Sequence, residues 1–381
     1  MKSVLCVLIA MCVSGPVLAE RLDDGQASHR PRGRLASTPY PNILFRPMKQ
    51  MNMGAHHYRA KVVRKTRETS GGHFYTRRGG FIDLSHLRKT TDWAAWLESQ
   101  IRQDLAKGKT TLRYRCSEPS LYHLTVDYPE AYTKWSKDKQ GAFREALALE
   151  LGLTVSYCAL TWHEILTWYG YSAVPFLSEK QSAFSWEDMY SHAVGIEVAR
   201  RAMLDRERPY NHAVTVALQD VVEELDPMPY ADMVHILEET RGVWWRYGRT
   251  LRRNLDIGQS GAVTPWLSDQ VDVAEPTLMK APHLRNVMGI DMSDRVVIEI
   301  EPNVKIAPVL LEVAGQVDRV RWRDFPRVMA AIEQEAIEQY GSLACGPVVK
   351  NRDEAPVALL NSGMGQPGFE SGYGALVEDR R

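Results

Sequence analysis

The chain has 381 residues, which fits one large domain or two smaller ones, and its 44% hydrophobic and 25% charged content is ordinary for a folded globular protein. Lys and Arg together number 47, as do Asp and Glu, so the formal net charge is zero. A nucleic-acid-binding chain normally carries a basic excess. We therefore expect no nucleic-acid partner.

The N-terminus, MKSVLCVLIAMCVSGPVLA, has the features of a secretory signal peptide. Lys2 precedes an apolar run from Val4 to Val13, and small residues lead to a cleavage site after Ala19. The run is too short to span a bilayer as a mature helix, and no later segment is apolar enough to do so. Met11 before Cys12 fits a lipoprotein cleavage site poorly. We expect a soluble periplasmic or secreted protein, rather than a lipid-anchored one, with no transmembrane segment in the mature chain.

Cleavage after residue 19 would leave three cysteines, Cys116, Cys158 and Cys345. An odd number in an oxidising compartment allows one disulfide and one free thiol. The sequence does not say which pair would form.

The chain is expected to be organised in five segments. The signal peptide (1–19) is followed by an extended lead-in (20–53), a main α+β domain (54–269), a C-terminal α/β extension (270–350) and a disordered tail (351–381). Alternation and Gly-rich turns over residues 57–87 predict two or more strands. A helix is expected from Asp92, and a further strand over 110–116.

Helices are predicted to dominate the remainder. Apolar spacing predicts a long helix over 139–169, which Gly152 would divide, and amphipathic helices within 182–203, 210–225 and 229–248. Ser185 and Asp188 have the spacing of an N-terminal capping box. One strand over 295–302 and one helix over 324–341 complete the pattern. The expected fold class is α+β, mostly helical with a small N-terminal antiparallel sheet.

The first stretch that could carry chemistry is YTRRGGFIDLSHLR, residues 75–88. Asp83 and His86 lie at the end of an apolar strand, where a charged group requires a partner or a function. Arg77 and Arg78 precede a Gly pair and are expected to bind an anionic part of a substrate. Alternatively, Arg and Asp pair to tie a hairpin to the helices.

The second stretch, YCALTWHEILTWYGYS, places His163 and Glu164 where a zinc protease helix would begin H-E-x-x-H, but Thr167 replaces the second His. A metal site would therefore need outside donors, so the expected ligand set is His163, His86 and Asp83, with zinc as the cofactor. These residues and Glu164, the general base, form the expected catalytic group, and Tyr169 is assigned to substrate binding. Alternatively, His163 and Glu164 belong to a buried polar network.

Two further arrangements remain open. Asp188 and His192 lie one helical turn apart and can act together, although helix capping accounts for Asp188 more simply. Cys158 paired with His86 or His73 would make a thiol nucleophile, whereas a small buried Cys is the simpler interpretation.

Three motifs in this order, YTRRGGFIDLSHLRKTTDW, WHEILTWYG and SAFSWEDMYS, resemble a bacterial envelope family known only as domain of unknown function 4056. The resemblance covers roughly residues 57–266. It implies an exported or lipid-anchored protein and no assigned reaction. The matching positions include Asp83, His86, His163, Glu164 and Asp188. The family pattern has Asn where this chain has His192, which argues against a catalytic role for that residue.

The leading hypothesis is a metal-dependent hydrolase acting on an envelope component such as peptidoglycan, lipid or protein. The second is a non-catalytic envelope protein whose His, Glu, Asp and Arg side chains form a buried network. The third is a cysteine-dependent acyl transferase or amidase. The partner is accordingly expected to be an envelope component or a small molecule.

Overall fold

The computed structural model describes residues 29–31, 48–58, 72–172, 179–247, 249–269 and 275–346, all of which belong to one compact unit spanning residues 1–347. The expected signal peptide, most of the lead-in and the tail from residue 351 lie outside the described residues. So does most of the strand expected just after His57.

A β-hairpin precedes the first long helix. β1 (His73–Thr76) pairs antiparallel with β2 (Gly80–Asp83). Gly80 has a φ of +66° and a Cβ added there would lie 2.1 Å from the carbonyl oxygen of Trp266, so only glycine fits this turn. The Gly pair therefore allows close approach to the protein's own backbone.

Helix α2 (Leu84–Ala106) begins directly after the hairpin, because an Asp83 carboxylate oxygen accepts a hydrogen bond from the Ser85 amide at 2.6 Å and caps the helix. The expectation that this helix starts at Asp92 is wrong, since an N-cap signal lies within the apolar strand pattern. His86 is consequently in the first turn of a helix and not at the end of a strand.

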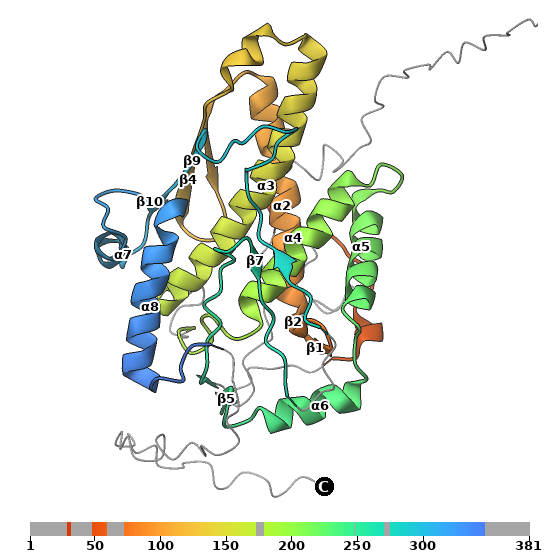
Figure 1. Ribbon diagram of the computed structural model, residues 1–381, viewed down its shortest axis with the longest axis vertical. Helices are drawn as coiled ribbons and strands as arrows, with labels where there is room; N and C mark the ends of the chain where they lie inside the picture. Colours follow the sequence, from red (N-terminus) through yellow and green to blue (C-terminus); the bar gives the residue numbers. More distant parts are fainter. Residues whose placement is uncertain are drawn as a thin grey trace, which may run out of the picture. The chain divides into compact units, whose positions relative to one another are not determined.

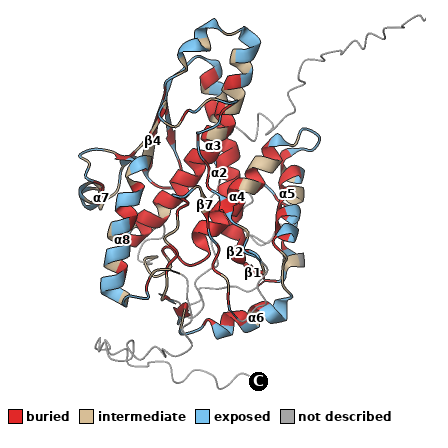
Figure 2. Cartoon of the chain, viewed as in Figure 1, coloured by how far each residue is buried: buried red, intermediate tan, exposed pale blue. Residues whose placement is uncertain are grey.

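Three helices form the core of the described structure: α2, α3 (Lys137–Trp168) and α4 (Asp188–Leu204). They cross one another in Figure 1 and are mostly buried in Figure 2. Two glycines permit the close crossings: a Cβ on Gly152 of α3 would lie 2.7 Å from the backbone nitrogen of Glu98, and one on Gly195 of α4 would lie 2.5 Å from the carbonyl oxygen of Leu87. Gly152 therefore does not divide α3, which is continuous.

A four-stranded antiparallel sheet joins distant parts of the chain. Its order is β10 (Val320–Arg321), β9 (Val296–Pro302), β4 (Ser120–Val126) and β3 (Thr111–Arg115). The ring of Phe325, the first residue of α8 (Phe325–Tyr340), stacks on Trp162 of α3 with 5.9 Å between centroids. The mostly helical α+β class is confirmed, and the sheet joins strands of residues 111–126 with strands of residues 296–321.

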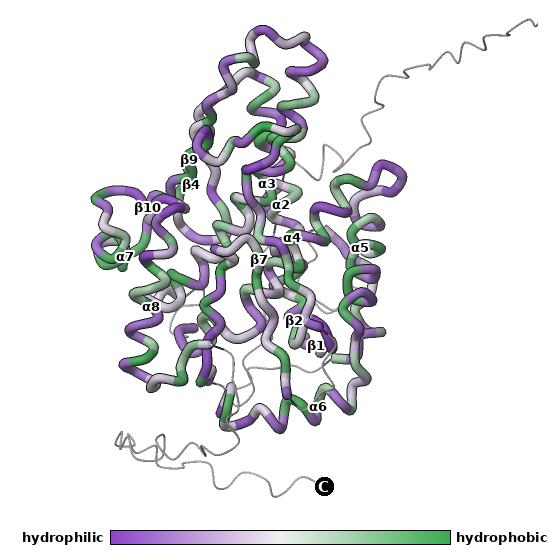
Figure 3. Tube along the Cα trace, viewed as in Figure 1, coloured by the Kyte–Doolittle hydropathy of each residue, from purple (hydrophilic) through white to green (hydrophobic). Residues whose placement is uncertain are grey.

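The remaining elements surround this core: α5 (Tyr210–Glu224), α6 (Tyr230–Glu239), α7 (Ala307–Ala314), the two-residue pairs β5–β6 (Trp245–Arg246, Arg249–Thr250) and β7–β8 (Ala262–Val263, Met279–Lys280), and three short 3-10 turns (Gln50–Asn52, Glu130–Lys134, Trp322–Asp324). Hydrophobic and hydrophilic positions alternate along α5 and α8, as expected for helices with one face on a core (Figure 3). No helix in the described ranges has the length and apolar character needed to cross a membrane.

Candidate metal centre

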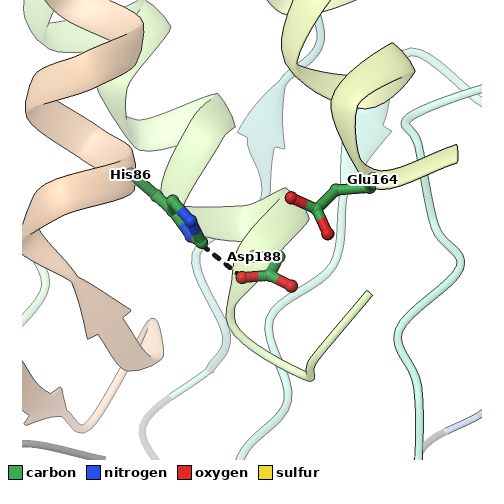
Figure 4. Close-up of side chains that lie close together, drawn as sticks. All are labelled: His86, Glu164 and Asp188. Atoms are coloured by element: carbon green, nitrogen blue, oxygen red, sulfur yellow. Dashed lines mark ion pairs between the residues drawn. The ribbon is translucent and has the colours of Figure 1, made fainter. Parts of the chain in front are cut away.

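The three core helices bring one side chain each to a common point. His86 comes from the first turn of α2, Glu164 from the end of α3 and Asp188 from the first position of α4. One ligand atom of each lies within 4.8 Å of the others, and Figure 4 shows the three side chains pointing toward one another. Ligands bound at about 2.0–2.2 Å to a single zinc ion lie no more than about 4.4 Å apart. Small side-chain adjustments would therefore allow all three to bind one ion.

His86 supplies a ring nitrogen between carboxylates. Its Nδ1 lies 2.9 Å from Oδ1 of Asp188 and 3.6 Å from Oδ2 of Asp83. Nδ1 is buried, and no hydrogen-bond acceptor in the described chain is aligned with it. A nitrogen held in this way is suited to a shared cation, either a proton or a metal ion.

Backbone amides in the loop before α4 hold both carboxylates of the group. The Phe184 amide donates to Oε2 of Glu164 at 3.1 Å, and the Ser185 amide donates to Oδ2 of Asp188 at 2.7 Å. The second contact is the reach-back half of the capping box expected at Ser185 and Asp188. Asp188 thus holds the amide of the preceding loop with one oxygen and faces His86 with the other.

Burial and mutual charge shift the protonation of the group. Burial, reinforced by Asp188, raises the pKa of Glu164 to about 8. Burial opposes protonation of His86, but Asp83 and Asp188 outweigh it and raise the pKa of His86 to about 10. In metal-free protein at neutral pH, both groups therefore carry a proton. Two protons occupy the place that one divalent cation would take, so the donor set of one imidazole and two carboxylates suits zinc, manganese or iron(II) electrostatically.

His163 faces away from this group toward a residue that the sequence analysis missed. Its Nδ1 lies 2.9 Å from Oε1 of Glu118, in the turn between β3 and β4. Burial and nearby Lys89 lower the pKa of His163. Burial would raise the pKa of Glu118, but the contact with His163 outweighs it and lowers that pKa. The result is a neutral imidazole held by an ionised carboxylate.

A second buried histidine links two more acidic residues. Nε2 of His73 lies 3.6 Å from Asp83 and 3.5 Å from Glu187. Burial opposes its protonation, but the two carboxylates outweigh burial and raise the pKa of His73. Asp83 therefore lies between His73 and His86 and connects the hairpin to α2.

The other residues expected at the site lie elsewhere. Arg77 forms a half-exposed ion pair with Asp226 at 3.0 Å, and Arg78 is exposed. Both are at the hairpin tip, about 10 Å along β2 from Asp83 at roughly 3.3 Å per residue. Tyr169 caps the end of α3, where burial and Glu335 of α8 raise its pKa.

Cys116, Cys158 and Cys345, which belong to the described residues, are free thiols, so the structure forms no disulfide among these three. Cys158 is fully buried, and burial raises the pKa of its thiol well above the ordinary value. A nucleophilic thiolate is not favoured in such surroundings. A cavity of about 500 Å³ lies between Met53 and Leu218 of α5, and none of the metal-centre residues lines it.

The fold and site define a mostly helical α+β protein with a buried carboxylate–imidazole centre between three helices. The chain belongs to the family described as Protein of unknown function (DUF4056), which matches residues 40–255, more than half of its length, and confirms the resemblance of the three motifs. No curated protein and no solved structure matches the chain.

Proposed function

We propose that this protein is an exported, metal-dependent hydrolase of an envelope component, with zinc as the resident ion. The observation that carries the proposal is the convergence of His86, Glu164 and Asp188 from three different helices, with a buried ring nitrogen lacking an aligned hydrogen bond. Three protein ligands leave a coordination position for water or substrate, as catalytic zinc sites require. The signal-peptide pattern supports export to the periplasm or beyond.

Hydrolysis would need one set of residues to bind the ion and another to transfer a proton. His86, Glu164 and Asp188 would hold the ion, which when bound lowers the pKa of water and polarises the scissile group. His163 would accept the proton at Nε2, because Glu118 faces its other nitrogen and keeps the hydrogen there. The sequence-based roles of His163 as ligand and Glu164 as base are exchanged in this proposal.

Side-chain exposure supports a role for His163 at the reaction. The His163 and His86 side chains are 16% and 14% exposed, whereas those of Asp188 and Glu118 are at most 3% exposed. The two imidazoles therefore lie at the boundary with solvent, and the carboxylates that orient them lie behind. This is the order expected when a substrate meets imidazoles held by buried acidic residues.

The alternative of a non-catalytic envelope protein has its own support. His73, Asp83 and Glu187 form a fully buried charged group that joins the hairpin, α2 and the start of α4. Such a group can be retained because it specifies how the elements pack. In that case the imidazoles and carboxylates would stabilise the fold and bind no ion.

Metal content of the purified mature protein, measured by elemental mass spectrometry, separates the two functions. We expect near-stoichiometric zinc in the parent, loss of zinc in His86→Ala and retention of zinc in His163→Gln. The zinc-loaded parent should then hydrolyse one class among peptide, ester and glycan substrates, and His163→Gln should not. A parent that stays free of metal after incubation with zinc, manganese and iron(II) would overturn the proposal and leave the structural network.

A further inference from the structure

Lys89 is a lysine of α2 whose side chain is mostly buried near the metal centre, and the proposed hydrolysis gives it no role. It lies on α2, three residues after His86, and is only 8% exposed. Within the described ranges it has no ion pair within 4.0 Å and no hydrogen bond to its side chain. A lysine side chain with little access to solvent and no direct partner in the described chain is placed to bind an anion.

Lys89 and His86 are three residues apart on α2 and therefore lie on the same face of that helix. Its field contributes to lowering the pKa values of His163 and Glu118 on one side and of Glu164 and His192 on others. Lys89 therefore lies beside His86, one of the three converging ligands, and its charge acts on the Glu118–His163 pair as well. A divalent ion at those ligands would repel it, which makes an anionic group between them more favourable still.

The nearby carboxylates are already engaged by other groups. Oε1 of Glu118 faces His163 and accepts from the Ser117 hydroxyl, and Oε2 of Glu164 accepts from the Phe184 amide. Oε2 of Glu118 has no hydrogen-bond partner in the described chain, so a longer-range Lys89–Glu118 charge balance is the competing explanation. The two explanations differ in whether an external anion binds.

We propose that Lys89 binds an anionic oxygen group of the substrate, a phosphate or a carboxylate, next to the bond that is cleaved. This inference rests on the proposed hydrolase function and specifies its substrate class. It gives Lys89 the role that the sequence analysis assigned to Arg77 and Arg78, which lie at the far end of the hairpin. A lysine suits this role as a compact point charge with three donors.

The test measures binding of inorganic phosphate and of acetate to the mature protein by titration calorimetry, with and without zinc. Lys89→Met should weaken binding of the preferred anion on the order of tenfold or more, because a charge-assisted contact is lost. Lys109→Met is the matched control, since Lys109 makes only an exposed pair with Asp104. Lys89→Arg should retain most of the binding. A preference for phosphate over acetate would identify a phosphorylated substrate, and the reverse a carboxylate.

Two results would overturn the inference: Lys89→Met binding both anions as tightly as the parent, or a correctly folded, zinc-loaded parent binding neither at millimolar concentration. The second result would leave the hydrolase proposal standing. If the parent takes up no metal but still binds an anion through Lys89, the hydrolase proposal fails and the anion site remains. Thermal unfolding of each variant verifies that the protein is folded before binding is measured.

Discussion

Nδ1 of His192 lies 2.9 Å from Oγ1 of Thr90, and this contact determines which nitrogen of a buried imidazole carries hydrogen. The Thr90 hydroxyl donates its single hydrogen to the carbonyl oxygen of His86 at 2.7 Å. It can only accept from His192, whose Nδ1 must therefore be the donor. Burial, followed by the charge on His86, lowers the pKa of His192 well below its ordinary value, so the ring stays neutral. Its Nε2 is a buried lone pair without a partner in the described structure.

This contact predicts different outcomes for two substitutions of His192. Asn carries its amide nitrogen on Cγ, as His carries Nδ1, so His192→Asn should keep the bond to Thr90 and unfold near the parental temperature. His192→Leu removes the donor and should cost about 1–3 kcal/mol of unfolding free energy. Urea denaturation measures both. Equal destabilisation by Asn and Leu would show that the hydrogen bond does not contribute. The same contact explains how Asn, expected at this position in the family pattern, serves the same purpose.

The raised pKa of Glu164 predicts how the stability of the metal-free protein depends on pH. Its pKa rises from 4.5 in its ordinary surroundings to about 8 in the fold, so the folded state holds a proton that the unfolded state releases. The stability from this group is fully present below pH 4.5 and declines until about pH 8. Glu164→Gln, which cannot ionise, should therefore gain stability relative to the parent across that window. Urea midpoints at pH 5 and pH 8.5, with chelator present, measure the difference.

A surface control makes the preceding measurement specific. Glu338 is exposed on α8, and Glu338→Gln should show no comparable gain between the two pH values. If the difference between parent and Glu164→Gln is the same at both pH values, Glu164 does not hold its proton in the fold.

Metal binding should release protons in a pH-dependent way. At pH 7 both His86, with a pKa of about 10, and Glu164, with a pKa of about 8, are protonated before an ion binds. We expect zinc binding to release about two protons at pH 7 and about one at pH 9, where Glu164 is already ionised. Calorimetry in buffers with different ionisation enthalpies counts these protons. Zinc uptake without proton release at pH 7 would exclude this pair as ligands.

Two glycines on the same helix should respond in opposite directions to alanine. Gly152→Ala places a Cβ 2.7 Å from the backbone of Glu98 and should destabilise the protein by about 1–3 kcal/mol through overpacking. Gly141 also lies within α3, but a Cβ there meets no atom within 4 Å. Gly141→Ala should therefore stabilise by about 0.5–1 kcal/mol, the ordinary helix preference for Ala. Thermal unfolding distinguishes the two, and destabilisation by both would argue against close helix contact at Gly152.

The local sequence pattern predicted much of the secondary structure. It failed where contacts between distant residues determine where an element begins or which strands pair. The long helix through residues 139–169, the strand over 295–302 and the helix over 324–341 all follow from apolar spacing. The start of α2 was missed because Asp83 ends a strand and caps a helix at the same position. Pairing of β9 with β4 was not foreseen, since nothing local to either strand specifies its partner.

The residues of the candidate site also fall into those that the sequence indicated and those that only the structure brings together. His86, His163 and Glu164 stand out from the sequence because polar groups interrupt apolar runs. Glu118 lies in a turn, where a carboxylate is common and gives no signal of function. Its contact with His163 depends on how β3 and β4 approach α3. Lys89 resembles any helix lysine until its burial is seen. Asp188 was recognised as a cap, and its second contact with His86 depends on the crossing of α2 and α4.

The sheet order has a consequence for the order of folding. The residues of the metal centre lie between positions 83 and 192, whereas β4 at 120–126 must wait for β9 at 296–302 to cover its edge. Contacts with short sequence separation form sooner on average than distant ones. The three-helix core and its centre are thus able to assemble while β4 still exposes an unpaired edge. Chains shortened before residue 296 would retain the residues of the centre and present that edge to other chains, which makes them prone to aggregate.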